Sequence, residues 1–285
     1  LFWMWISAVV GMATKFFTCT LAILYRGKDE NGEVQGGPMY VITEGLPKSF
    51  HFLAYLFAVA GLFGCFSLFQ ANQLTQIIQD QIFVPLDLFS QNPMKGQLLI
   101  GVLLTGIISL VIFGGIRRIG QVAARLVPAM VLLYILCGFF ILLGNITNLD
   151  NILLLIINDA FTGHAIAGGT LGSVMITGIR RAAFSNEAGI GTESMAHGAA
   201  ITKEPVREGL VAMLGPMIDT LVVCSITGFA ILSTGVWQNS NLNGISMTSA
   251  AFEAGLPFLG ETVLLIIVCI FSITTIIGYS YYGSK

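Results

Sequence analysis

A polar stretch with several functional groups interrupts an otherwise apolar sequence between Arg180 and Ala200. It reads RRAAFSNEAGIGTESMAHGAA and holds two arginines, two glutamates, an asparagine and three glycines. A fourteen-residue apolar run with four glycines, Ile166–Ile179, lies shortly before it. Discontinuous helices with such breaks form the substrate sites of many secondary transporters. The stretch is therefore the first candidate for a binding site inside a membrane.

The apolar run is too short to cross a bilayer as one helix. At about 1.5 Å per residue it extends about 21 Å, whereas a hydrocarbon core is about 30 Å thick. We therefore expect an interrupted crossing, Ile166–Ala200, made of two half-length helices joined by non-helical backbone. Ser185 and Asn186 are good N-cap residues and Glu187 favours a first turn, so the second half-helix is expected to begin near Ser185, where free N–H groups would attract a carboxylate. The alternative is that Arg180–Ala200 forms a cytoplasmic loop with a capped surface helix.

Two charged residues lie inside apolar runs, where ionisable groups are costly and usually functional. Asp219 stands near the middle of PMIDTLVVCSITG, and the alternative to a functional role is a structural acid bonded to neighbouring helices. Lys15, in GMATKFF, either extends its ammonium group to the membrane surface or pairs with Asp219 or Glu187. We expect surface extension or structural pairing of Lys15 rather than direct contact with a ligand.

A third group of candidate ligands is hydroxylic. Ser272, Thr274 and Thr275 fall within about one helical turn in CIFSITTIIGYSYYG. Hydroxyl and carbonyl oxygens are suitable ligands for a hard cation. The alternative is that these side chains bond to their own helix, as serine and threonine often do.

The sequence contains no pattern typical of an enzyme or of a resident metal site. It lacks a G-x-S-x-G elbow, an H-E-x-x-H helix, a P-loop and paired catalytic carboxylates. The three histidines lie in separate connections or at a segment end. The five cysteines lie in apolar stretches without C-x-x-C spacing, so they are expected to be small buried hydrophobic residues. We predict neither catalysis nor a bound cofactor.

The elements that must position these groups are membrane helices. Of the 285 residues, 55% are hydrophobic and only 10% are charged, whereas a soluble domain carries about a quarter charged residues. Apolar runs near the length of a bilayer-crossing helix, about 20 residues, recur along the chain. We therefore predict an all-α integral membrane protein. Besides the interrupted crossing, the predicted spans are Phe2–Tyr25, Phe52–Phe69, Leu98–Gly115, Val127–Gly144, Leu210–Leu232 and Glu261–Tyr281.

The basic residues predict the orientation of the chain. Eleven of the thirteen lie in alternate connections, and by the positive-inside rule those connections face the cytoplasm. The C-terminal end is then cytoplasmic, in a multi-pass protein of the inner or plasma membrane. Because the net charge is −2, there is no basic surface for nucleic acid. The expected partners are the lipid bilayer and a small solute, and the pattern specifies no oligomeric state.

Five segments together resemble one known family. FWMWISAVVG at Phe2–Gly11, GMATKF, GGPMY, FSNEAGIGT and SYYG are similar to motifs of the sodium:alanine symporter family, also called alanine or glycine:cation symporters. These motifs extend from one end of the chain to the other. Because the chain begins within an apolar segment and ends directly after another, we expect residues 1–285 to be a single transmembrane domain fragment of a longer protein.

The resemblance implies the inverted-repeat transporter fold of the leucine-transporter type, with about seven transmembrane segments here, one of them discontinuous. This chain would supply the second to eighth helices of that fold, without its first helix and its last helices. The broken segment would be the sixth helix, and the last span would be the eighth. The residues that would line or shape an amino-acid site are Phe184, Ser185, Asn186, Glu187, Ala188 and Gly189, and those that would help to hold a sodium ion are Thr274, Thr275 and Ser272.

One position departs from the family pattern. An acid follows GMATKF after one residue in the family, whereas this chain has Thr18 there, so the resemblance assigns no acid beside Lys15. We predict sodium-coupled symport of a small neutral amino acid, alanine or glycine first, by alternating access. Na⁺ is the expected coupling ion. The alternatives are proton coupling, with Asp219 or Glu187 titrating, and a non-transporting membrane sensor or structural subunit.

Overall fold

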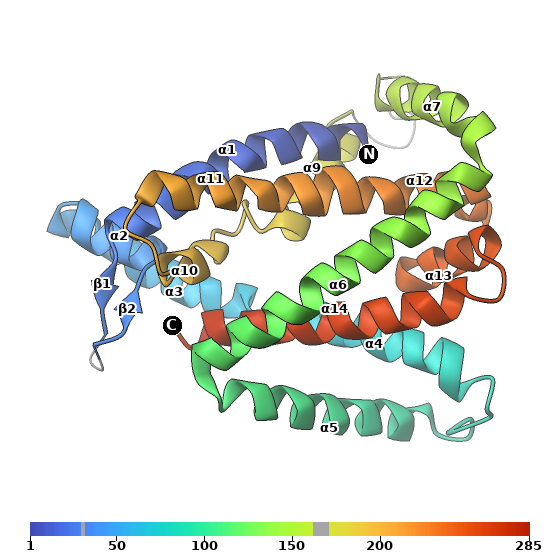
Figure 1. Ribbon diagram of the computed structural model, residues 1–285, viewed down its shortest axis with the longest axis horizontal. Coiled ribbons are helices and arrows are strands. Elements are labelled where there is room, and N and C mark those ends of the chain that lie inside the picture. Colours follow the sequence, from blue (N-terminus) through green and yellow to red (C-terminus); the bar gives the residue numbers. More distant parts are fainter. Residues whose placement is uncertain (30–31, 162–170) are drawn as a thin grey trace. The chain divides into compact units, whose positions relative to one another are not determined.

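The chain is almost entirely helical, as Figure 1 shows. The computed structural model describes residues 1–29, 32–161 and 171–285. Within these ranges the only strands are β1 (Gly27–Lys28) and β2 (Val34–Gln35), which pair antiparallel. The predicted all-α fold class is therefore confirmed.

Six helices in the described ranges are long and apolar enough to cross a membrane. They are Phe2–Leu24, Lys48–Phe83, Pro93–Ile112, Arg118–Gly144, Pro205–Thr234 and Gly260–Gly283. Prolines begin two of them, at the first helical position, where the missing N–H group would have had no partner within the helix. These six overlap the six spans that were predicted as uninterrupted, although one of them is broken.

The second of these apolar helices contains a break. α3 (Phe52–Gly64) ends at Gly64, and α4 (Leu68–Ile78) begins at Leu68. The predicted span Phe52–Phe69 therefore does not form one helix. The interruption falls in GLFGCFSLFQ, where Gly61, Gly64 and Ser67 weaken a helix, but the prediction followed the apolar length alone. α4 continues directly into a π-helical stretch, η2 (Gln79–Phe83).

The chain divides into two compact units, each of which is described by itself. The segments of the first unit are Leu1–Phe66, Leu153–Ser225 and Tyr282–Lys285, and those of the second are Ser67–Ile152 and Ile226–Tyr281. Each unit thus gathers segments that lie far apart in the sequence. A single transmembrane domain over residues 1–285 stays a prediction.

In the first unit, α1 (Phe2–Leu24) is the helix against which the others pack. It contacts α9 (Leu171–Asn186), α10 (Glu193–Gly198) and α11 (Pro205–Pro216), and it runs beside α11 in Figure 1. Most residues of its buried face lie three or four positions apart, which is the spacing of one side of an α-helix. They are Met4, Ala8, Gly11, Lys15, Cys19, Ala22 and Ile23. Several of these side chains are small, which lets neighbouring helices approach closely.

The first unit also contains a π-helix, η4 (Met217–Cys224), which continues directly from α11 and contacts α1 and α9. It follows Pro216, which lacks the N–H group that an α-helical hydrogen bond needs. The remaining elements are α2 (Pro38–Gly45), η1 (Lys48–Phe50), α3 and most of α7 (Leu149–Phe161).

The second unit is organised around α6 (Gly115–Gly144). α6 contacts α5 (Pro93–Ile112) and α13 (Gly244–Gly255), and α13 also contacts α4. The Tyr134 hydroxyl lies 2.5 Å from Thr227 Oγ1, and the rings of Tyr134 and Phe252 are 5.4 Å apart. These contacts join α6 to α12 (Ser225–Thr234) and α13. The other elements are η2, η3 (Ile146–Asn148), η5 (Val236–Gln238) and α14 (Gly260–Gly283).

Replacing Gly209 with valine is expected to destabilise the first unit. A Cβ atom at Gly209 would lie 2.7 Å from the carbonyl oxygen of Phe16 and would also meet Thr20 Oγ1, so α11 would have to move away from α1. Overpacking of this kind costs about 1–3 kcal/mol, and the midpoint of thermal unfolding of the purified protein should fall. Gly101→Ala in α5 is the control, because its added Cβ atom meets no atom within 4 Å. Equal midpoints for Gly209→Val and the wild type would contradict this packing.

Candidate functional site

The polar stretch identified in the sequence contains a helix break, which lies in the first unit. α9 ends at Asn186, α10 begins at Glu193, and residues 187–192 are not helical. Glu187 has a φ angle of 58° and Gly191 one of 82°, so the chain adopts the left-handed conformation twice. This conformation is uncommon for a glutamate and persists only where surrounding contacts enforce it. One such contact is the hydrogen bond that Thr192 Oγ1 donates to Glu187 Oε2 at 3.4 Å.

The position of the break corrects the sequence prediction. An interruption within Ile166–Ala200 is confirmed, but α9 runs continuously through Arg180, Ser185 and Asn186. The prediction that a second half-helix begins near Ser185 is therefore wrong. Serine and asparagine bond to nearby backbone groups at either end of a helix, and here they end one. The predicted start of the interrupted crossing, residues 166–170, lies outside the described residues.

Asn186 is the side chain that fixes the break. Only 2% of its surface is exposed. Its Nδ2 donates a hydrogen bond to Thr220 Oγ1 on η4 at 3.2 Å, and its Oδ1 accepts one from the N–H group of Ala188 at 3.1 Å. Gly11 of α1 lies against it, since a Cβ atom at Gly11 would be 3.3 Å from Nδ2. The amide thus satisfies a backbone donor inside the break and joins the break to η4 and α1.

Two further side chains extend this contact into what we call the polar cluster, formed by Ser185, Asn186, Thr220 and Cys224. Thr220 Oγ1 donates to Ser185 Oγ at 3.4 Å, and Ser185 Oγ lies 3.2 Å from Cys224 Sγ. Thr220 and Cys224 belong to the π-helix η4. Because π-helical turns are rare and occur frequently at functional sites, the geometry of η4 supports a binding role for this region.

Lys15 lies among acidic groups on the buried face of α1, where it is 7% exposed. Its ammonium group interacts electrostatically with the carboxylates of Glu193 and Asp219. The Nζ atom also lies close to α11, because a Cβ atom at Gly215 would be 3.1 Å away from it. The burial of Lys15 fits a structural role rather than extension to the membrane surface, and its ammonium group acts electrostatically on both carboxylates without an ion pair to either within 4 Å.

Glu193 is a residue that sequence reasoning missed. It is the first residue of α10, it is 3% exposed, and its Oε1 accepts a hydrogen bond from Thr18 Oγ1 at 3.3 Å. The acid that the family pattern would place at position 18 is thus absent, but a carboxylate from another element reaches the same place. The sequence showed an acid shortly after the glycine pair, but nothing local indicated a contact with a residue 175 positions earlier.

The other predicted substrate residues have different surroundings. Phe184 is 71% exposed and takes no part in the polar cluster. Ala188 packs against α1, since a Cβ atom at Gly11 would lie 3.4 Å from the Ala188 Cβ atom. A Cβ atom at Gly189 would lie 2.7 Å from that of Ala183, so a glycine is needed for the chain to fold back against α9.

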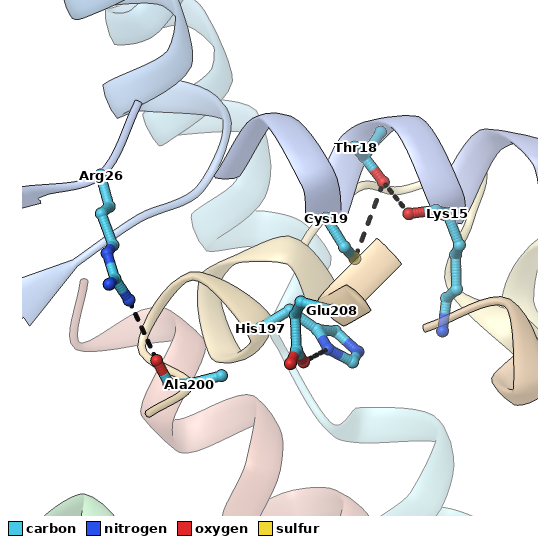
Figure 2. A network of polar contacts seen from close by, with 7 residues as sticks. All are labelled: Lys15, Thr18, Cys19, Arg26, His197, Ala200 and Glu208. Carbon is cyan, nitrogen blue, oxygen red and sulfur yellow. Dashed lines mark hydrogen bonds and ion pairs between the residues drawn. The ribbon is translucent and has the colours of Figure 1, made fainter. Parts of the chain in front are cut away.

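Polar side chains also hold the far end of α10, as Figure 2 shows. Arg26, which follows α1, donates a hydrogen bond to the carbonyl oxygen of Ala200 at 3.0 Å. It donates another to the carbonyl oxygen of Thr202 at 2.7 Å. His197 Nδ1 and Glu208 Oε1 lie 2.6 Å apart and join α10 to α11. The C-terminal end of α10 is therefore held by contacts to the segment after α1 and to α11.

The predicted cation ligands lie on α14, in the second unit. Ser272 is 2% exposed. Thr274 Oγ1 donates to the carbonyl oxygens of Ile270 and Phe271 at 2.8 and 3.0 Å, so Thr274 bonds to its own helix. A hydroxyl that donates in this way retains oxygen lone pairs for a cation. Ser272, Thr274 and Thr275 therefore stay predicted ligands, described apart from the polar cluster of the first unit.

Comparison with known proteins establishes the family. The model of the sodium:alanine symporter family matches residues 1–285. The chain belongs to this family. Its members are transporters, which confirms the prediction that the chain is not an enzyme.

Three relatives are similar along nearly the whole chain. A transporter of Haemophilus influenzae is 39% identical over 294 residues, and the sodium/alanine symporter AgcS of Methanococcus maripaludis is 38% identical over 288 residues; each match covers 100% of this chain and 62% of the relative. The probable sodium/glutamine symporter GlnT of Bacillus subtilis is 36% identical over 284 residues, covering 99% of this chain and 57% of GlnT. The chain thus spans about three fifths of the length of these relatives.

Replacing Asn186 with alanine should loosen the break. The N–H group of Ala188 and the hydroxyl of Thr220 would each lose a partner, and an unsatisfied buried polar group costs about 1–3 kcal/mol. The midpoint of thermal unfolding should fall, and amide hydrogen exchange at residues 187–192 should become faster. Thr220→Val keeps the bond from the Ala188 N–H group to Asn186 Oδ1, so it should have the smaller effect on exchange at residues 187–192. Unchanged exchange in Asn186→Ala would show that this side chain does not hold the break.

Proposed function

We propose that the protein carrying this chain is a sodium-coupled symporter of a small neutral amino acid, alanine or glycine first, that works by alternating access. The observation that supports this most directly is the break at residues 187–192, held by the buried Asn186. Irregular backbone is tolerated at membrane depth only where protein or a watery cavity satisfies its polar groups. In secondary transporters such breaks bind the substrate, and membership of a symporter family supports the same function.

The proposed substrate site is the end of α9 together with the start of the turn that follows it, residues Phe184, Ser185, Asn186, Glu187, Ala188 and Gly189. An amino-acid zwitterion needs hydrogen-bond donors for its carboxylate and acceptors for its ammonium group. Non-helical backbone can provide donors, because its N–H groups are not committed to a helix. In this turn the N–H groups of Ala188, Ile190 and Gly191 bond within the turn, so these three would exchange a partner to bind a carboxylate. The C-terminal end of α9 provides carbonyl oxygens and the partial negative charge of the helix dipole, which favours an ammonium group.

The names of the relatives support a neutral substrate and sodium coupling. AgcS is named for sodium and alanine, and GlnT for sodium and glutamine. We propose that Ser272, Thr274 and Thr275 contribute oxygen ligands for Na⁺. If both ligands stabilise the same occluded state, Na⁺ raises the affinity for the amino acid by the factor by which the amino acid raises the affinity for Na⁺. From the distribution of basic residues we propose that the C-terminal end of the chain faces the cytoplasm.

Proton coupling is the second candidate function. It is favoured by the charges at Lys15, where two acidic groups share one ammonium group. Asp219 or Glu187 would then carry the proton in place of Na⁺. The two candidates differ in the gradient that they require.

The test is uptake of labelled alanine, glycine and serine into proteoliposomes that contain the complete protein, under Na⁺, Li⁺ or H⁺ gradients. We expect uptake of alanine or glycine that requires an inward Na⁺ gradient. Asn186→Ala should reduce this uptake at least about tenfold, the effect of about 1.4 kcal/mol, because it loosens the turn that binds the substrate. Phe258→Ala is the control, since Phe258 is 100% exposed, and it should transport like the wild type.

Two results would contradict sodium-coupled symport. Uptake that persists without Na⁺ but collapses when the pH gradient is removed would establish proton coupling instead. Absence of uptake under every gradient, with protein that elutes as a single folded species, would favour a non-transporting sensor or structural subunit.

A further inference from the structure

The carboxylate of Glu193 has an unsatisfied oxygen in the interior of the first unit. Oε1 accepts the hydrogen bond from Thr18, whereas Oε2 is buried and has no hydrogen-bond partner among the described residues. The residue as a whole is 3% exposed. Leaving a polar atom unpaired in such a place is costly, and the cost is larger when the group carries a charge. The position therefore indicates a ligand that removes the charge or pairs with it.

Ionisable groups from several elements of the first unit lie around Glu193. α1 brings Lys15 and the thiol of Cys19, and the break brings Glu187. Glu208 of α11, which is paired with His197 of α10, acts on the same Cys19. η4 brings Asp219, whose carboxylate interacts electrostatically with the same Lys15. β2 also packs on α10 but consists of the neutral residues Val34 and Gln35. Among the described residues, Lys15 is the cation that acts on both the Glu193 and the Asp219 carboxylate, so a single ammonium group faces two acids.

A proton fits this position better than a metal ion. A hard metal cation such as Ca²⁺ takes about six to eight oxygen ligands, whereas the contacts at Glu193 bring together one carboxylate and the hydroxyl of Thr18. No group of three or more His, Cys, Asp and Glu side chains suited to a metal occurs in the described part of the chain. The Lys15 ammonium group would also repel a second cation. A proton binds to Oε2 itself and needs no additional ligands or cavity.

We propose that Glu193 is a reversible proton-binding site, which takes one proton from water on Oε2 and becomes a neutral carboxylic acid. When Glu193 is protonated, Lys15 interacts with the charged carboxylate of Asp219 alone. When Glu193 is deprotonated, Lys15 interacts with both carboxylates. Because Glu193 is the first residue after the break, its charge controls how α10 packs on α1. Given the proposed symport function, this makes the conformation of the substrate turn depend on proton concentration, even where Na⁺ is the coupling ion.

The experiment is infrared difference spectroscopy of the complete, purified protein in lipid, without substrate, as the pH is raised from mildly acidic to mildly alkaline. The wild type should show the C=O stretching band of a protonated carboxylic acid, and this band should disappear at higher pH. Glu193→Gln should lack the band. Asp219→Asn and Glu208→Gln are the matched controls and should retain a titrating band.

A second measurement covers the case in which Glu193→Gln does not fold. Labelling the wild type with ¹³C-glutamate should move the band to lower frequency, whereas ¹³C-aspartate should leave it in place. Absence of a titrating band in the wild type, its persistence in folded Glu193→Gln, or a shift with ¹³C-aspartate alone would overturn the proposal. Loss of the band on adding Na⁺ at constant pH would overturn it in favour of a metal-ion site. The infrared experiment does not measure transport. A negative uptake test would therefore contradict the proposed function without contradicting proton binding by Glu193.

Discussion

The first unit depends on one constraint: backbone groups that leave a helix inside a protein must find partners there. Within residues 187–192 the carbonyl oxygen of Glu187 accepts from the N–H groups of Ile190 and Gly191. The amide of Asn186 accepts from the N–H group of Ala188 and donates to Thr220. The same amide lies against Gly11. A single buried side chain therefore ends one helix, shapes the turn that follows it and connects that turn to two neighbouring elements.

Close helix packing around α1 makes this arrangement possible. Glycines let backbones meet where a larger residue would separate them, and several of them lie against α1. A Cβ atom at Gly178 would be 2.7 Å from that of Trp3, and one at Gly36 would be 2.6 Å from the carbonyl oxygen of Ala22. Gly36 also lies against Gly198 at the end of α10. In a membrane, where no hydrophobic force brings helices together, such close contacts are a main source of association.

Much of the fold could be predicted from the sequence, because membrane helices are specified by local composition. Apolar length predicted the uninterrupted spans, and the first of them, Phe2–Tyr25, differs from α1 only by its last residue. The short glycine-rich run before Arg180 predicted an interruption. The break after Gly64 was missed because apolar length outweighed the local signals of a helix end, Gly64 and Ser67.

The details of the candidate site were harder to predict because distant contacts determine them. Capping preference placed a helix start at Ser185, whereas the bond from Asn186 to Thr220, 34 positions away, accompanies a helix end. Glu193 was missed because its partner Thr18 is on another helix. The electrostatic link between Lys15 and Asp219 was among the alternatives, since two opposite charges in apolar helices are expected to find each other.

The central claim is that the break after Asn186 binds the amino acid. The most direct measurement is a cryo-EM map of the complete protein prepared with alanine and Na⁺. The account predicts density for alanine at residues 187–192, with its carboxylate oxygens within roughly 2.7–3.2 Å of backbone nitrogens. Continuous helix through residues 187–192, or alanine density bound elsewhere with this turn empty, would contradict it.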